Sequence, residues 1–242
     1  MSPLRVVTWN CRQGFDAKAD ALLALQPDIA VVPESHQHPK VAETSLFGGG
    51  VPHLWAGSLT NKGLGLFAPS AEALIQIEPV SYDDAGDFGL AAVATHVNGP
   101  TKVIGVWTVP ANQGPNRYLT AAQRIMRRYE NVLSGGDTIV AGDLNVSGKT
   151  DPRGMQAFAA MLHDRFGLVS AYHAFHGVKI GDEKDDTLWW RGHETEGYHC
   201  DFVFVPTKWR IVDVQIGAFA EWGSFTASAR SDHAPVIVTL EK

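Results

Sequence analysis

Short runs of apolar and β-branched residues, separated by Gly, Pro, Asn and Asp, recur along most of the chain. Runs of this kind between turn residues predict buried or half-buried strands. Many such strands with few helices predict mixed sheets, two of them packed face to face with helices on the outside. The predicted strands cover residues 4–9, 28–32, 63–67, 72–77, 90–97, 103–109, 138–141, 201–205, 211–216 and 235–240.

Three stretches have helical spacing instead. The clearest covers residues 117–133, where apolar residues recur three and four positions apart until Gly135 and Gly136 end the pattern. A second helix is predicted over residues 155–166. A short third helix should begin after Asp16, a plausible N-cap, and end before Pro27.

The length and composition set further bounds. A chain of 242 residues that is 45% hydrophobic can bury a large core as one unit, so we expect a single domain over residues 1–242, and a monomer. The net charge of -6 argues against a protein that coats nucleic acid, because such binding needs many basic residues. Any contact with nucleic acid must therefore come from a local patch.

Cysteine usage and hydropathy indicate the compartment. Cys11 and Cys200 are the only two cysteines, too few for a disulfide framework, which suits a reducing environment. By strand alternation we expect both side chains to point away from any site and to be buried core thiols. No apolar stretch is long enough to span a bilayer, and no leader pattern precedes the first strand, so we expect a cytoplasmic location.

Five places share one pattern, a polar residue at or beside the end of an apolar strand. A polar side chain next to a buried strand is costly unless it finds partners, so the recurrence predicts that these residues partner one another around a shared site. They are Asn10, Glu34, Asp143 with Asn145, Asp201, and Asp232 with His233.

The side-chain types favour one kind of chemistry. Carboxylate and carboxamide oxygens suit Mg²⁺, Mn²⁺ or Ca²⁺, whereas Cys11 and Cys200 stand singly and lack the paired spacing of a zinc site. One or two such ions can neutralise a phosphate oxygen, while an imidazole and a carboxylate manage the attacking water. The pattern thus predicts a metal-dependent hydrolase of phosphate esters.

Taken alone, each motif could be a turn or a solvated loop charge; five in one order are far more specific. Together they resemble the signature blocks of the endonuclease/exonuclease/phosphatase superfamily, over residues 8–235. The resemblance implies a four-layered α/β sandwich of two mixed, mostly antiparallel sheets with helices outside. The blocks are Thr8-Trp9-Asn10, Pro33-Glu34-Ser35, Gly142-Asp143-Leu144-Asn145, Asp201-Phe202-Val203-Phe204-Val205 and Ser231-Asp232-His233-Ala234-Pro235.

For the metal, the resemblance implies Mg²⁺ or Mn²⁺ and a set of three ligands. Glu34 corresponds to the family's principal metal ligand. Asn10 would hold the metal or a phosphate oxygen beside it, and Asp232 would assist.

For the reaction, the resemblance implies four catalytic residues. Asp143 would orient or deprotonate the attacking water, and Asn145 would donate to the transition-state phosphate. His233 would contact the scissile phosphate, held in orientation by Asp201.

One departure from the family leaves the substrate open. Where its nucleases carry Tyr or His just before a Pro on the central strand, this chain has Trp107 and Thr108 before Val109-Pro110. Neither residue can donate a proton as Tyr or His does. A nucleic-acid or nucleotide-like phosphodiester is the first hypothesis; a phosphomonoester, phosphoinositide or phospholipid head group is the second; a catalytically silent binding module is the third.

Five further residues are weaker candidates for substrate contact. Trp222 could line the pocket, although such residues are more often core. Arg230 is a candidate for a phosphate contact by charge, as are Arg117 and Arg191. His36, close to Glu34 in sequence, could touch the substrate.

Overall fold

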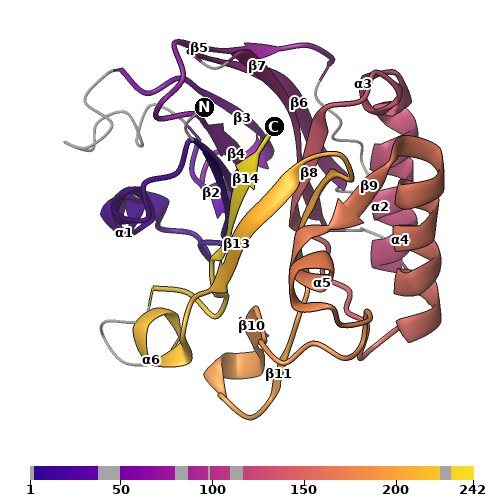
Figure 1. Cartoon of the computed structure of the whole chain (residues 1–242). Helices are drawn as coiled ribbons and strands as arrows, with labels where there is room; N and C mark the ends of the chain where they lie inside the picture. Colours follow the sequence, from indigo (N-terminus) through magenta and orange to yellow (C-terminus); the bar gives the residue numbers. More distant parts are fainter. Residues whose placement is uncertain (1–2, 38–49, 80–86, 98, 110–116, 224–229) are drawn as a thin grey trace.

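Two six-stranded sheets packed face to face form the centre of the molecule (Figure 1). The computed structural model describes residues 3–37, 50–79, 87–97, 99–109, 117–223 and 230–242. The first sheet has the order β13 (Arg210–Ile216), β14 (Val236–Glu241), β1 (Leu4–Thr8), β2 (Ile29–Ser35), β4 (Lys62–Phe67) and β3 (His53–Leu59).

The second sheet faces the first. Within the sheets β1 pairs with β2, and β7 with β8, in parallel, and the other pairings are antiparallel. The predicted pair of mixed, mostly antiparallel sheets is therefore confirmed. The order of the second sheet is β5 (Ala73–Gln76), β6 (Asp87–His96), β7 (Gly99–Thr108), β8 (Thr138–Asp143), β12 (Asp201–Pro206) and β9 (Leu168–Ser170).

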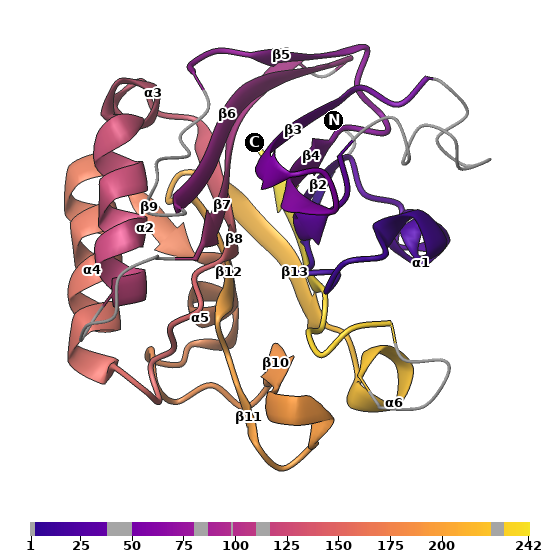
Figure 2. The same ribbon diagram turned by 180° about the vertical axis from the view of Figure 1, so that it is seen from behind.

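Apolar side chains fill the space between the sheets and hold helices on both outer faces. Val31 and Val238 of the first sheet share one buried cluster with Val103 and Val203 of the second. The layers are therefore helix, sheet, sheet and helix (Figure 2). The first sheet carries η1 (Phe15–Ala17), α1 (Ala19–Ala24) and α6 (Phe219–Trp222), and the second carries α2 (Arg117–Arg128), α3 (Glu130–Ser134) and α4 (Pro152–Phe166).

Two predicted helices differ in detail. The helix expected over residues 117–133 is interrupted at Tyr129, whose backbone leaves helical geometry while its hydroxyl donates to the carbonyls of Gly89 (2.7 Å) and Pro79 (3.1 Å). Asp16 does not cap the first helix, because it lies inside η1 and α1 begins only after Lys18. The hydrogen bonds of Tyr129 thus interrupt the first of these helices, and the short turn η1 delays the start of the other, against the local sequence pattern. None of the described helices is long and apolar enough to cross a membrane.

The parallel pairings bring the ends of separate strands to one edge. β1 and β2 run together from Val6↔Ile29 to Thr8↔Val31, so the residues that follow them lie side by side. In the facing sheet β8 passes β7 at Gly142, its next-to-last residue, where φ is +148° and an added Cβ would lie 1.8 Å from the Val106 carbonyl oxygen. Only glycine allows β8 to pass β7 this closely, and Asp143 follows at once.

A small hairpin closes the same end of the molecule. It consists of β10 (Leu188–Trp189) and β11 (Gly197–Tyr198), with η2 (Trp190–Gly192) between them (Figure 1). An isolated bridge between Leu188 and His233 ties the hairpin to the segment before β14. A remaining helix, α5 (Ala171–His176), packs on β12 and β13.

Candidate active site

Asn10 joins the two sheets at this edge. It follows β1, is buried, and its Nδ2 donates to Asp143 Oδ2 at 2.9 Å and to Glu34 Oε1 at 3.3 Å. These three residues were predicted to share a site from their positions after separate strands. The structure brings them together in one hydrogen-bonded group.

Strained backbone surrounds this group. Glu34 has φ +60° and lies at a register shift of β2 between Pro33 and Ser35, so the bulge turns its side chain toward Asn10. Asn145, Arg12 and Gln13 have φ values of +50°, +51° and +62°. Non-glycine residues rarely adopt this region, and they cluster at functional sites because the surrounding structure holds them there.

Asp143 is a fully buried acceptor in this network. Its Oδ1 accepts from the Asn145 backbone N–H at 2.8 Å, and its Oδ2 accepts from Asn145 Nδ2 at 2.9 Å as well as from Asn10. Burial, reinforced by the charge of Asp201, raises the pKa of Asp143 to about 7, against the opposing effects of His233 and Asn10. A carboxyl group with such a pKa can take up and release a proton near neutral pH.

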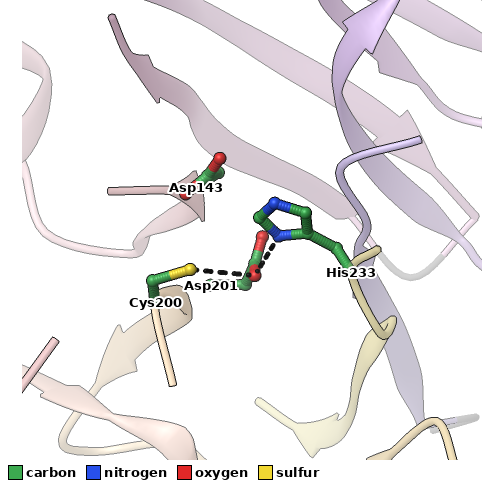
Figure 3. A group of neighbouring side chains, drawn as sticks. All are labelled: Asp143, Cys200, Asp201 and His233. Carbon is green, nitrogen blue, oxygen red and sulfur yellow. Dashed lines mark hydrogen bonds and ion pairs between the residues drawn. The ribbon is translucent and has the colours of Figure 1, made fainter. Parts of the chain in front are cut away.

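His233 and Asp201 form a buried pair beside Asp143 (Figure 3). His233 Nδ1 lies 2.8 Å from Asp201 Oδ2, which also accepts from the Thr187 hydroxyl at 2.8 Å. Burial alone would lower the pKa of His233, but the charge and hydrogen bond of Asp201 raise it to about 10. Asp201 thus holds the ring in place, the contact that the resemblance implied, and its charge also favours the imidazolium form. The Thr187 hydroxyl holds Asp201 in turn.

The side chain of Cys200 points into the site, so the prediction that it points away was wrong. Its Sγ is 3.6 Å from Asp201 Oδ2 (Figure 3). Cys200 precedes β12, and its N–H and that of Asp201 both donate to the Thr187 hydroxyl, at 2.9 and 3.0 Å. In an extended strand, successive N–H groups and side chains point in alternating directions. Here both N–H groups point at one oxygen, so the alternation is broken and the Cys200 side chain turns inward. Cys11, in contrast, is buried in the outer core of the first sheet.

Basic side chains accompany both carboxylates predicted as metal ligands. Lys62 Nζ is 3.3 Å from Glu34 Oε2 and 5.2 Å from the centre of the Trp107 ring, and Arg12 Nε is 3.6 Å from Asp232 Oδ2. Sequence reasoning missed Lys62, because no motif marks which hairpin lysine reaches back to a neighbouring strand. The structure leaves the metal assignments of Glu34, Asn10 and Asp232 as predictions.

Three of the weaker candidates make their contacts outside this network. Trp222 is 2% exposed and packs edge-on against Trp9 at 5.0 Å, so it is a core residue, and the alternative that it lines the pocket does not hold. Arg230 lies over the Trp222 ring at 4.7 Å and pairs with Glu221 at 3.1 Å. His36 Nδ1 is 3.0 Å from Asp16 Oδ1.

A groove of about 410 Å³ opens beside Asn145. Trp190, half exposed, lines it together with Tyr118, Tyr198 and Arg117. Burial, with the nearby Cys200 and Asp143, raises the pKa of Tyr198. The groove therefore places aromatic faces and a cation beside Asn145.

Another cavity of similar volume, about 400 Å³, contains none of the predicted site residues. Its lining includes Leu4, at the start of β1, and Asp28, just before β2, so it lies at the opposite end of these strands from Asn10 and Glu34. Of these two cavities, the groove beside Asn145 is therefore the one that includes a predicted catalytic residue.

Comparison with known proteins identifies the fold. No family model matches the sequence, and no curated protein matches it significantly. A 3'-5' exonuclease from Neisseria meningitidis matches with a TM-score of 0.70 at 20% identity, over 97% of this chain and 98% of that one. An endonuclease/exonuclease/phosphatase from Bacteroides vulgatus gives 0.71 at 14% identity, over 100% and 99% of the two chains. An AP endonuclease from Leishmania major gives 0.67 at 14% identity, over 100% and 88%. This chain therefore has the fold of the endonuclease/exonuclease/phosphatase superfamily.

Proposed function

We propose that this protein is a divalent-metal-dependent phosphodiesterase that acts on nucleic acid or a nucleotide-like diester. The observation that carries the proposal is the hydrogen-bonded group of Asn10, Glu34 and Asp143 beside the Asp201–His233 pair. Residues from five separate segments of the chain converge on it. The similar structures named as an exonuclease and an AP endonuclease support the same reaction class.

Glu34, with Asn10 and Asp232, is the set that would hold Mg²⁺ or Mn²⁺. Its donors fit, since they are the hard oxygens that these ions prefer. Lys62 and Arg12 already place positive charge beside Glu34 and Asp232, as expected of a region that attracts cations. A bound divalent ion supplies charge neutralisation at the phosphate.

The remaining steps of the reaction fall to side chains of the protein. Asp143 accepts a hydrogen bond from the attacking water and takes its proton, and His233 donates to a non-bridging phosphate oxygen while Asp201 holds its ring. Asn145 Nδ2 donates to the Thr108 carbonyl at 3.0 Å and to Asp143. It must release the Thr108 carbonyl to reach the phosphate.

The groove favours a diester with an aromatic base. Exposed aromatic faces stack on bases without regard to sequence, and a guanidinium contacts a neighbouring phosphate. Trp190, Tyr118 and Arg117 supply these groups next to Asn145. The net negative charge of the chain does not argue against such a substrate, because only the residues of the groove would contact it.

One observation favours a phosphomonoesterase as the second candidate. Thr108, in place of the family's Tyr or His, is buried, and its hydroxyl donates to the Leu144 carbonyl at 2.5 Å. It is therefore committed to the core and cannot protonate a poor leaving group. Only an ester whose leaving group is already good makes little demand on such a donor, so the missing Tyr or His weighs against a nucleic-acid diester.

Removal of divalent metal is expected to abolish hydrolysis. The test measures turnover of bis-p-nitrophenyl phosphate, p-nitrophenyl phosphate and a single-stranded oligonucleotide with Mn²⁺, with Mg²⁺ and with EDTA. We expect the diesters to exceed the monoester, EDTA to remove activity, and excess Mn²⁺ to restore it. Full activity in EDTA contradicts the metal role. Faster monoester turnover selects the second candidate, and no turnover of any substrate selects a silent binding module.

Lys62→Met is expected to weaken substrate binding more than it slows turnover. Lys62 places a cation over Trp107, beside Glu34, where a substrate phosphate would add negative charge. We expect KM to rise by about tenfold, the value of one charged contact of roughly 1.4 kcal/mol, with a smaller change in kcat. Lys62→Arg should recover most of the loss. Lys149→Met, which removes an exposed lysine paired with Asp186, is the matched control. An unchanged KM in Lys62→Met contradicts this role.

A further inference from the structure

We propose that Asp143, Cys200, Asp201 and His233 form a second metal site, one that takes a soft divalent ion such as Zn²⁺ and inhibits the enzyme. This soft-metal site is separate from the hard-cation position at Glu34. Its binding step stands independently of the proposed function, whereas inhibition rests on it.

The donor atoms are already gathered. One nitrogen, oxygen or sulfur atom from each of the four residues lies within 4.8 Å of the others, and all four residues are buried (Figure 3). In a four-coordinate zinc site, bonds of about 2.0–2.3 Å put the donors roughly 3.3–3.8 Å apart. A contraction of about one ångström therefore completes the geometry.

The donor types select zinc over magnesium. A thiolate, an imidazole and carboxylates suit Zn²⁺, whereas Mg²⁺ takes oxygen ligands in octahedral geometry and keeps several waters. The sequence argued against zinc because Cys200 has no cysteine partner at zinc-finger spacing. The fold supplies the other ligands from β8, β12 and the segment before β14.

An unsatisfied oxygen in the same cluster points independently to a ligand. Asp201 is fully buried, and its Oδ1 has no hydrogen-bond partner in the part of the chain that the structure describes. A buried carboxylate oxygen without a partner costs free energy, which a bound cation would recover. Oδ2 meanwhile keeps its hydrogen bond from Thr187, so Asp201 can bind an ion through Oδ1 without losing that support.

An ion bound at the soft-metal site would stop catalysis because it occupies atoms that the reaction uses. Binding displaces two protons to solvent, one from the Cys200 thiol and one from the His233 imidazolium, and bonds from the sulfur and from the freed imidazole nitrogen to the ion form in their place. An oxygen of Asp143 also binds the ion. Neither His233 nor Asp143 can then serve a phosphate or a water.

Titration with Cd²⁺, a soft analogue of Zn²⁺, tests the binding step directly. A thiolate bound to Cd²⁺ gives an ultraviolet charge-transfer band, and the chain has only two cysteines. Cys11→Ser is the matched control, since Cys11 is also buried and free but lies in the outer core, with Sγ 3.5 Å from the Pro33 carbonyl oxygen. We expect the band in the wild type and in Cys11→Ser, and no band in Cys200→Ser.

Competition with a chromophoric zinc chelator measures the affinity for Zn²⁺ itself. We expect Cys200→Ser to lose at least the 10–100-fold that even a supporting residue contributes at a metal site, about 1.4–2.8 kcal/mol. Thermal unfolding without metal tests whether each variant is folded. If Cys200→Ser does not fold, Cys200→Ala takes its place, and its spectrum is compared with the wild-type band. No band in the wild type, or a band that persists without Cys200, overturns the site. If the wild type hydrolyses no phosphoester, the proposed function fails while the Cd²⁺ result still judges this site. If Zn²⁺ binds through Cys200 but leaves turnover with Mn²⁺ unchanged, inhibition is refuted.

Discussion

Asp143→Asn is expected to lower kcat for phosphodiester hydrolysis by about 10²–10⁴-fold, the range that a positioned acid or base contributes. The amide nearly matches the carboxylate in size but cannot take a proton from water. Asp143 also accepts from three N–H groups, of Asn10, Asn145 Nδ2 and the Asn145 backbone. An amide must turn its NH₂ toward one of these donors, which disturbs the group further. Single-turnover rates with saturating Mn²⁺ measure the effect.

Asp143→Asn is expected to lower activity but to raise the stability of the folded protein at neutral pH. Burial raises the pKa of Asp143 to about 7 in the folded protein, from 3.8 in the unfolded chain. Between these values unfolding releases a proton, so ionisation of Asp143 makes the wild type less stable as the pH rises from 3.8 to 7. The Asp143→Asn variant has no carboxyl group to ionise at this position and therefore escapes this loss.

Thermal unfolding in EDTA at pH 5 and pH 8 gives the measurement. The Tm of Asp143→Asn minus that of the wild type should become more positive at the higher pH. Lost activity with a falling Tm difference would mean that the variant is damaged in its folding, and the catalytic assignment would lose its support. A variant that is inactive yet more stable at pH 8 is the result expected of a group held for function.

The strand pattern was enough to predict the two sheets and the group of polar residues at their edge. The apolar runs that end in Asn10, Glu34 and Asp143 indicate both the strands and the shared site, because a polar group beside a buried strand is costly unless it finds partners. The resemblance of their order to a known superfamily then supplied the roles. Local patterns sufficed wherever a residue's place follows from the strand to which it belongs.

Residues placed by tertiary contacts could not be predicted in this way. Lys62 reaches Glu34 from a hairpin, and Thr187 turns Cys200 inward by accepting two successive N–H groups. Trp222 is buried against Trp9, although its Gly- and Ser-rich surroundings suggested a pocket. The groove at Trp190 depends on how the β10–β11 hairpin packs, which no spacing in the sequence encodes.

His233→Ala is expected to be the second most damaging change, with a loss of about 10³-fold or more in kcat/KM. The ring is 5% exposed and is the only imidazole hydrogen-bonded to Asp201 among the described residues. Its raised pKa, about 10, keeps it cationic and therefore a donor to phosphate at neutral pH. Loss of one preorganised donor of this kind costs about 10²–10³-fold, and loss of the cation adds to it. Activity near the wild-type level in a folded His233→Ala variant would remove His233 from the mechanism.

Asp201→Asn separates orientation from contact. If Asp201 acts only by holding His233, its loss should cost less than the loss of the ring itself, because an untethered imidazole still reaches the phosphate part of the time. It should also lower the pH at which the falling limb of kcat/KM begins, since the imidazolium loses the charge that stabilises it. Removing both residues should then be no worse than removing His233 alone, because the two act as one unit. Additive losses in the double variant would instead mean that Asp201 has its own contact with the reaction, and the free Oδ1 would be the atom that makes it.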